Sequence, residues 1–238
     1  RHLTELGHHV TVVTPLYGFI RQQPVNLEPV GTTAIVVGGR SYPIRFYRTW
    51  LNDKLPVIFV EQEGLFNRDK HYGEPDDNIR FYVFDRAVLE AIKTLNLKPQ
   101  IIHCHDWHTG LIPNMLAKGE GQDPHFSRAA TVFTIHNLAF QMQGDWWSVP
   151  EEMRDHGKGP IPDDPQLIRF VNFAKRGIRY ANIINTVSIR YAQEILTPEF
   201  GQGLDRFLLR RKDDVYGIVN GIDYTTFNPK FDQNIWEH

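Results

Sequence analysis

The chain has a single cysteine, very little net charge and no long run of apolar residues. One cysteine among 238 residues cannot form an internal disulfide, which suits a reducing compartment. A formal net charge of −2 gives no electrostatic reason to expect nucleic acid or an acidic membrane surface as a partner. A membrane span would need a run of about 18 apolar residues, so none is expected. The composition, 41% hydrophobic and 23% charged, is that of a globular chain able to bury a sizeable core.

Internal repeats and low-complexity tracts are absent as well, and short apolar strands instead alternate with amphipathic helices. The pattern predicts strands at residues 9–15, 33–38, 43–48, 56–61, 100–105, 129–136, 181–188 and 215–221. It predicts helices at residues 77–95, with Asp77 as a cap, and at 109–117, 167–179, 189–196 and 204–210. This alternation predicts an α/β fold with a mainly parallel, Rossmann-like sheet and helices on both of its faces.

Two segments do not follow the alternation. The first residues, RHLTELG, resemble the last turn of a helix ended by Gly7, so we expect the chain to begin inside an element. Residues 144–166 are rich in proline and form a long excursion from the sheet, a kind of loop that is often functional. Within it, Trp146 and Trp147 are either sugar-binding surface or packing anchors.

Polar clusters follow three of the predicted strands. They are residues 105–108 (HDWH), residues 136–137 (HN) and residues 220–221 (NG). In an open parallel sheet, ligands bind beyond the carboxyl ends of the strands. The three clusters would therefore line one edge of the sheet, and this edge is the predicted functional site.

The segment IIHCHDWH, residues 101–108, first suggests a metal centre, because it holds three histidines, an aspartate and the only cysteine. Its spacing matches no zinc signature, and no second cluster completes a ligand shell. We expect His103 to face the core as a hydrogen-bonded buried residue. A metallohydrolase remains an alternative that metal analysis would separate.

Trp107 lies between Asp106 and His108 in this segment. An aromatic face beside a carboxylate and an imidazole is a common way to hold a sugar, because the ring covers C–H groups while the polar groups bind hydroxyls. The alternative is that Trp107 is a core residue.

Four motifs resemble one family in order and spacing: HCHDWHTGLIP, FTIHNLAFQ, NTVSIRYAQEILTPEFGQGLD and GIVNGIDYTTFNP. They are similar to the amino-terminal domain of bacterial glycogen synthases and plant starch synthases, glycosyltransferase family 5. The resemblance implies one half of the two-domain GT-B fold. It implies retaining transfer of glucose from ADP-glucose, or less often UDP-glucose, to the non-reducing end of an α-1,4-glucan such as glycogen, starch or maltooligosaccharides. It implies no metal and no cofactor, and a location in the bacterial cytoplasm, or in the plastid of a plant or alga.

The resemblance also implies roles for individual residues. His136 matches the histidine beside the donor glucose, which supports the oxocarbenium-like transition state, and is the expected catalytic residue. The other matches are expected substrate contacts: Asp106, Trp107, His108, Asn137, Asn220, Tyr72 and Asn78.

The chain departs from the family pattern in places. Ile189 follows Ser188 where the family usually has proline, and the segment at residues 140–144 is two residues longer than usual. The family's Lys-X-Gly-Gly-Leu loop would lie upstream of Arg1. We therefore expect residues 1–222 to form an amino-terminal, acceptor-side domain truncated at its start, and residues 223–238 to begin the connection to a carboxyl-terminal nucleotide-binding domain. The alternative is a non-catalytic glucan-binding or regulatory module of the same ancestry.

Overall fold

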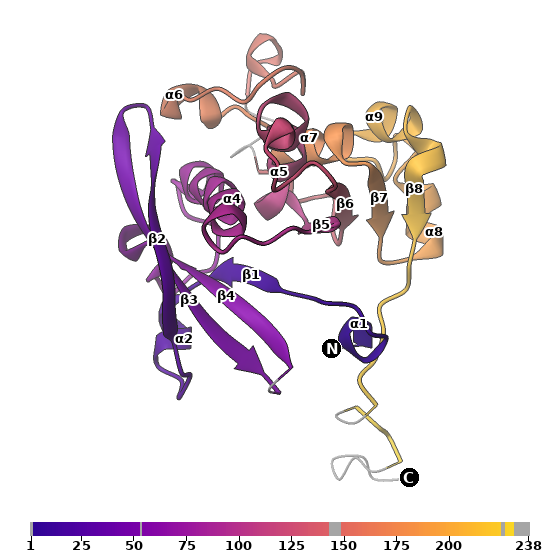
Figure 1. Ribbon diagram of the computed structural model, residues 1–238. Coiled ribbons are helices and arrows are strands. Elements are labelled where there is room, and N and C mark those ends of the chain that lie inside the picture. Colours follow the sequence, from indigo (N-terminus) through magenta and orange to yellow (C-terminus); the bar gives the residue numbers. More distant parts are fainter. Residues whose placement is uncertain (1, 53, 143–148, 225–226, 231–238) are drawn as a thin grey trace.

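The computed structural model describes residues 2–52, 54–142, 149–224 and 227–230, which fold around two four-stranded sheets (Figure 1). Trp146 and Trp147 lie outside the described residues, so their predicted role stays a prediction. In the second sheet, β5 (Ile101–His105), β6 (Ala130–Ile135), β7 (Ile183–Thr186) and β8 (Val215–Gly217) pair in chain order and are all parallel. The carboxyl ends of these four strands therefore lie along one edge.

The first sheet corrects the expectation of a mainly parallel arrangement. Its order is β1 (Val12–Pro15), β4 (Leu55–Glu61), β3 (Arg40–Leu51) and β2 (Glu28–Val37). Only β1 and β4 pair in parallel, whereas β2, β3 and β4 are antiparallel. The reason is the turn between β2 and β3, where Gly38 and Gly39 both have positive φ, of 53° and 79°. Two such residues make a tight hairpin, which returns the chain at once beside the strand it has left.

Helix α4 (Asp77–Thr94) lies between the two sheets in Figure 1 and joins their cores. Its side chains Phe81, Val83, Phe84 and Val88 are buried in one hydrophobic cluster with residues of both sheets. The predicted helix at 77–95 is confirmed to within one residue at its end. Burial of one long helix on both sides explains why the sequence pattern found it readily.

The predicted helix at residues 167–179 is wrong as one element. It forms two helices, α6 (Pro165–Ile168) and α7 (Phe173–Tyr180), because Asn172 ends the irregular segment between them and caps α7 by accepting from the amide of Lys175 at 2.8 Å. Helix α7 lies directly on β6. A Cβ on Gly177 would lie within 2.6 Å of the Phe133 ring, so this approach requires glycine.

The remaining helices are short and connect the strands. They are α1 (His2–Glu5), α2 (Gly18–Arg21), α3 (Glu63–Phe66), α5 (Ile112–Lys118), α8 (Ile189–Glu194) and α9 (Asp205–Leu209), with 3-10 turns η1 (Trp107–Thr109), η2 (Glu120–Gln122), η4 (Glu151–Met153) and η5 (Lys212–Asp214). Across the described ranges, no helix has the length and apolar character needed to cross a bilayer.

Candidate active site

Asp106 links the ends of two neighbouring strands. Its backbone amide donates to the carbonyl of Thr134 at 2.8 Å, and its carboxylate oxygen Oδ1 accepts from the amide of His136 at 2.8 Å. Asp106 also has φ of 55° and ψ of −174°, a conformation that L residues rarely adopt. Strain of this kind persists where the surroundings fix the backbone, and it clusters at functional sites. The end of β5 thus holds the backbone that follows β6.

Three histidines form a row along this edge. The rings of His103 and His105 stack with centroids 4.2 Å apart, and Nδ1 of His105 lies 3.0 Å from Nε2 of His136. Nε2 of His103 lies 2.6 Å from the hydroxyl of Thr134, which donates to Asn185 at 2.6 Å. The row joins the side chain of His136 to polar groups on β5, β6 and β7.

His103 does not face the core as expected. The strand alternates, so Ile102 and Cys104 are buried while His103 and His105 lie on the exposed side. Residues that are two apart on a strand lie on the same face. His103 and His105 therefore share the face that carries the histidine row.

Nδ1 of His105 and Nε2 of His136 are paired with each other at 3.0 Å. Among the described residues, no group of three or more His, Cys, Asp or Glu side chains is placed to hold a metal ion.

An aromatic cluster stands beside the row, and Trp107 lies beneath it. Trp107 is only 4% exposed, stacks on His108 with centroids 3.9 Å apart and meets Phe81 edge-on at 4.8 Å. The outer members are Tyr72, which is 49% exposed and 5.3 Å from the His108 ring, and Phe140, which is 52% exposed and 6.4 Å from Tyr72. The accessible aromatic surface therefore belongs to Tyr72 and Phe140, while Trp107 supports it from below.

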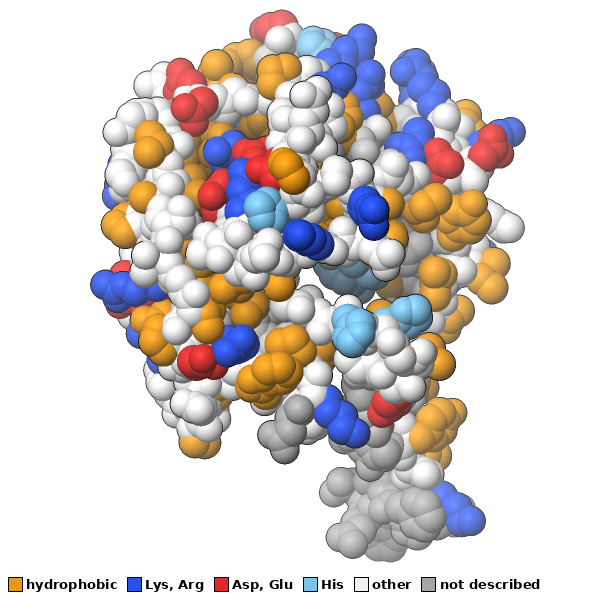
Figure 2. All heavy atoms as spheres, in the orientation of Figure 1, with side chains coloured by type: hydrophobic (Ala, Val, Ile, Leu, Met, Phe, Trp, Pro, Cys, Tyr) orange, Lys and Arg blue, Asp and Glu red, His pale blue; other side chains and the backbone are white. Residues whose placement is uncertain are grey.

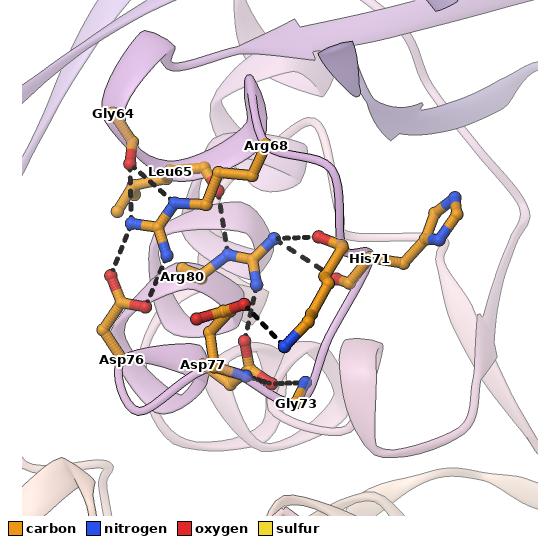
Figure 3. A network of polar contacts seen from close by, with 10 residues as sticks. Gly64, Leu65, Arg68, His71, Gly73, Asp76, Asp77 and Arg80 are labelled. Atoms are coloured by element: carbon orange, nitrogen blue, oxygen red, sulfur yellow. Dashed lines mark hydrogen bonds and ion pairs between the residues drawn. The ribbon is translucent and has the colours of Figure 1, made fainter. Parts of the chain in front are cut away.

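A buried arginine holds the loop that carries Tyr72 (Figure 3). Arg80 is fully buried in α4, and its guanidinium donates to the carbonyls of Leu65 at 2.8 Å and His71 at 3.2 Å and to Asp77 at 2.6 Å. Asp77 accepts from the amide of Gly73 at 2.5 Å. Its carboxylate therefore caps the preceding loop and not the helix, which corrects the expected cap. Both partners fix the backbone on either side of Tyr72.

A second arginine acts on the same loop. Arg68 donates from both terminal nitrogens to the two carboxylate oxygens of Asp76, each at 2.7 Å, and also to the carbonyl of Gly64 (Figure 3). This ion pair lowers the pKa of Asp76, mainly through the hydrogen bond from Arg68. Bidentate arginine–carboxylate pairs are geometrically specific, so the loop between α3 and α4 has a defined shape.

The other predicted contacts are placed less closely. Asn137 accepts from the amide of Ala139 at 3.0 Å and shapes the turn after β6. Asn78 is buried in the first turn of α4, one turn before Phe81. Asn220 is exposed beyond the end of β8, and no hydrogen bond in the described part of the chain joins it to the histidine row.

The row and the ends of β5–β8 lie at one side of the molecule. Figure 2 shows a hollow on this face, below the strands that Figure 1 labels β5 to β8, and histidine side chains at its lower border lie where Figure 1 places α1. The chain leaves β8 past the same edge on its way to the C-terminus.

Several residues of this site were not predicted individually from the sequence. His105 was counted only as part of its segment, although it contacts His136 directly. The Tyr191 hydroxyl, on α8, accepts from the amide of Leu138 at 3.0 Å. The Thr109 hydroxyl accepts from the amide of His105 at 2.6 Å. The two residues are four apart in the sequence, and the turn after β5 brings them together. Each of these contacts forms only when the chain folds, so the sequence pattern does not reveal it.

The pKa of His108 is lowered from 6.5 to about 4, first by burial and then by the positive charge of Arg80. His105 lies on the open face of β5, but its ring packs against those of His103 and His136. Its pKa is likewise lowered to about 4, first by the desolvation of the ring and then by these histidine neighbours. In the folded chain both rings therefore stay neutral at neutral and mildly acidic pH. Unfolding frees them to bind protons below about pH 6.5. Between about pH 6.5 and 4 the unfolded state takes up more protons, so stability falls as pH falls through this window.

We expect His108→Phe to weaken this acid destabilisation. Phenylalanine keeps the stack on Trp107 but has no group to protonate, so the free energy of unfolding should fall less steeply below about pH 6.5. Urea unfolding at a series of pH values measures it. His125→Phe is the matched control, because His125 lies on another loop beside Asp123. Equal slopes in His108→Phe and the unmodified chain would contradict the expectation.

Trp107→Ala is expected to lower the free energy of unfolding by about 3 kcal/mol, because it removes a large buried ring and leaves a cavity. Urea unfolding of residues 1–238 measures the change. A folded variant of unchanged stability would contradict the packing role of Trp107.

Comparison with known proteins places this geometry in one family. The model described as the starch synthase catalytic domain matches residues 1–210. The glycogen synthase of Geotalea daltonii is 39% identical over 244 residues, which cover 99% of this chain and 49% of that protein. The glycogen synthase of Bacillus subtilis is 38% identical over 239 residues, covering 98% of this chain and 48% of that protein.

A solved structure agrees with these matches. The catalytic domain of starch synthase IV from Arabidopsis thaliana, bound to ADP and acarbose, superposes with a TM-score of 0.80 at 32% identity, covering 98% of this chain and 48% of that one. The chain spans about half the length of the curated relatives it matches. The expected fold class is confirmed as the α/β fold of a GT-B glycosyltransferase. With residues 1–210 matched, the chain belongs to the starch synthase catalytic domain family, the family of glycogen and starch synthases.

Proposed function

We propose that this chain is the acceptor-side half of a glycogen or starch synthase that transfers glucose, with retention of configuration, from ADP-glucose to the non-reducing end of an α-1,4-glucan. The observation that carries the proposal is the junction of β5 and β6, where Asp106 holds the backbone of His136 at the carboxyl edge of the parallel sheet. The ADP and acarbose bound by the Arabidopsis relative support a sugar nucleotide and a glucan as ligands.

In this proposal His136 is the catalytic residue beside the donor glucose. Positive charge develops on the sugar ring in the transition state, so a protonated neighbour would oppose it. His105, whose pKa is lowered to about 4, is neutral and hydrogen bonded to the His136 ring. It acts as a positioning residue, since it orients the imidazole without adding a positive charge to the site.

In this proposal the acceptor binds on the exposed aromatic surface of Tyr72 and Phe140. The rings of Tyr72 and Phe140 are about half exposed and meet edge-on, with centroids 6.4 Å apart. Such rings cover the C–H faces of glucose units, and in this proposal Asn137 and Asp106 supply the polar groups that bind hydroxyls. Trp107 and His108 support Tyr72 through ring contacts. Asn78, and Asn220 on the way to the second domain, are further substrate contacts in this proposal.

The domain assignment is part of the same proposal. Residues 1–222 form the acceptor-side domain, and residues 223–238 begin the connection to the nucleotide-binding half. The roughly doubled length of the curated relatives supports this division. Because positioning of both substrates can supply about 7–11 kcal/mol of barrier reduction, residues 1–238 alone are not expected to turn over.

The test is an assay of the full-length protein with radiolabelled ADP-glucose or UDP-glucose and with glycogen or maltooligosaccharides as acceptor. Incorporation into glucan, greater with ADP-glucose and unaffected by a chelator, is the expected result. Glucan binding without any transfer would instead support the non-catalytic module. Hydrolysis that is lost on chelation would support the metallohydrolase.

A further inference from the structure

A second hollow lies on the outer side of α7, with a volume of about 850 Å³. Its lining includes the rings of Phe170 and Phe207 and the cationic side chains Lys158, Arg179 and Arg210. Arg169 lies over the Phe170 ring at 4.5 Å and Lys175 over the Phe207 ring at 5.1 Å, and neither cation is part of the lining. Figure 2 shows lysine and arginine side chains gathered at the upper right of the molecule, over the region that Figure 1 labels α7 and α9.

This hollow is separate from the histidine row. Helix α7 begins at Phe173, whose ring contacts Trp107 under the candidate active site, and ends at Tyr180, just before β7 begins. Arg179 is therefore near the opposite edge of the sheet, at the amino end of β7. Arg211 marks the same end, because it donates to the carbonyls of Ile178 and Ala181. A ligand here would not compete directly with one at the carboxyl edge.

The wall of the hollow is held in shape by a buried ion pair. Asp155 pairs with Arg176 through both carboxylate oxygens, at 2.8 and 2.9 Å, and both side chains are less than 10% exposed. Arg176 also donates to the carbonyls of Lys158 and Gly159, each at 2.9 Å. The loop is thus tied to α7 before any ligand arrives, which limits the ordering cost of binding.

The same contacts leave the hollow positively charged. Asp155 is the acidic residue of the lining, and Arg176 neutralises it. None of the ion pairs within the described ranges involves Lys158, Arg179 or Arg210. The chain as a whole carries a formal charge of −2, so this concentration of positive charge does not reflect a general excess.

We propose that this hollow binds a small sugar phosphate, with the phosphate among Lys158, Arg179 and Arg210 and the sugar ring over Phe170 and Phe207. Arginine is well suited to phosphate, because its guanidinium presents paired donors to two oxygens. The volume lies in the range of small-molecule sites, and the three cations line one hollow, whereas a long polyanion needs an extended basic stripe. This site goes beyond the proposed transferase activity and does not depend on it.

The experiment is isothermal titration of residues 1–238 with glucose 1-phosphate, inorganic phosphate and glucose. We expect glucose 1-phosphate to bind more tightly than inorganic phosphate, glucose not to bind at this site, and the affinity to fall as salt rises. The double variant Arg179→Gln/Arg210→Gln should weaken glucose 1-phosphate binding at least about tenfold. The matched control is Arg206→Gln, on α9 but outside the lining, which should leave the affinity unchanged.

The outcomes separate the alternatives. Binding that the double variant does not change places the ligand elsewhere and overturns the proposal. Equal affinity for inorganic phosphate and glucose 1-phosphate overturns the role of the two phenylalanine rings. Binding of an RNA oligonucleotide or heparin, with none of glucose 1-phosphate, overturns the assignment to a small ligand. Circular dichroism of both variants verifies that a loss of binding is not a loss of folding.

Discussion

Replacement of His136 by alanine in the full-length protein is expected to lower kcat by about 10²–10³-fold while KM for the sugar nucleotide changes little. The reason is that an interaction formed mainly in the transition state is lost from kcat and not from ground-state binding. The position of His136, tied to Asp106 through its backbone and to His105 through its ring, motivates this expectation. Steady-state kinetics with varied ADP-glucose at saturating glycogen measures it.

Two further variants sharpen the result. His105→Phe retains a ring but removes the hydrogen bond to His136, so kcat should fall by about tenfold, the worth of one such bond. His125→Ala, on a distant loop, should have normal kinetics and serves as the control. A near-normal kcat in a folded His136→Ala variant would remove this residue from the catalytic machinery. A normal kcat in His105→Phe would remove only the positioning role.

Arg80→Met is expected to lower the free energy of unfolding by about 3–5 kcal/mol, because removal of one partner of a buried pair leaves the other charge uncompensated. Arg80 is fully buried, its partner Asp77 is 4% exposed, and the carbonyls of Leu65 and His71 would also lose their donor. Urea unfolding of residues 1–238 measures the change.

The matched control is Arg86→Met on the same helix. Arg86 pairs with Glu120 at 3.3 Å but its side chain is 37% exposed, so its loss should cost about 1 kcal/mol or less. In the full-length protein, Arg80→Met should also raise acceptor KM, because the loop that carries Tyr72 loses its anchor. Equal losses of stability in the two variants would show that burial of Arg80 has no special weight.

The two arginine networks suggest why the chain tolerates long loops around its sheets. Arg80 and Arg68 hold the loop before α4, and Arg176 holds the loop before α6. In each case a guanidinium satisfies backbone carbonyls that have no partner in a helix or strand, and buried carbonyls need such partners. The loops can therefore be both irregular and well defined, as the walls of binding sites must be.

The elements that could be predicted from the sequence are those whose partners are near in the chain or whose pattern is strong. Helix α4 was found from its apolar spacing, and β5 and β6 from short apolar runs. Because parallel strands end at a common edge, the sequence also placed residues 105–108 and His136 together. The four motifs were sufficient for the family.

Strand pairing, side-chain burial and the contacts of the site depend on which segments pack together, so they became visible only in the folded chain. Strand propensity did not say that β2, β3 and β4 pair antiparallel, because propensity is a property of one segment and pairing is a property of two. Alternation along β5 put His103 and Cys104 on opposite faces, but packing chose Cys104 for the core. Trp107 was buried by α4 and α7, which come from before and after it in the chain. The contacts of His105, Arg80 and Tyr72 arise in the same way, since each joins residues that only folding brings within hydrogen-bond or ring-contact distance.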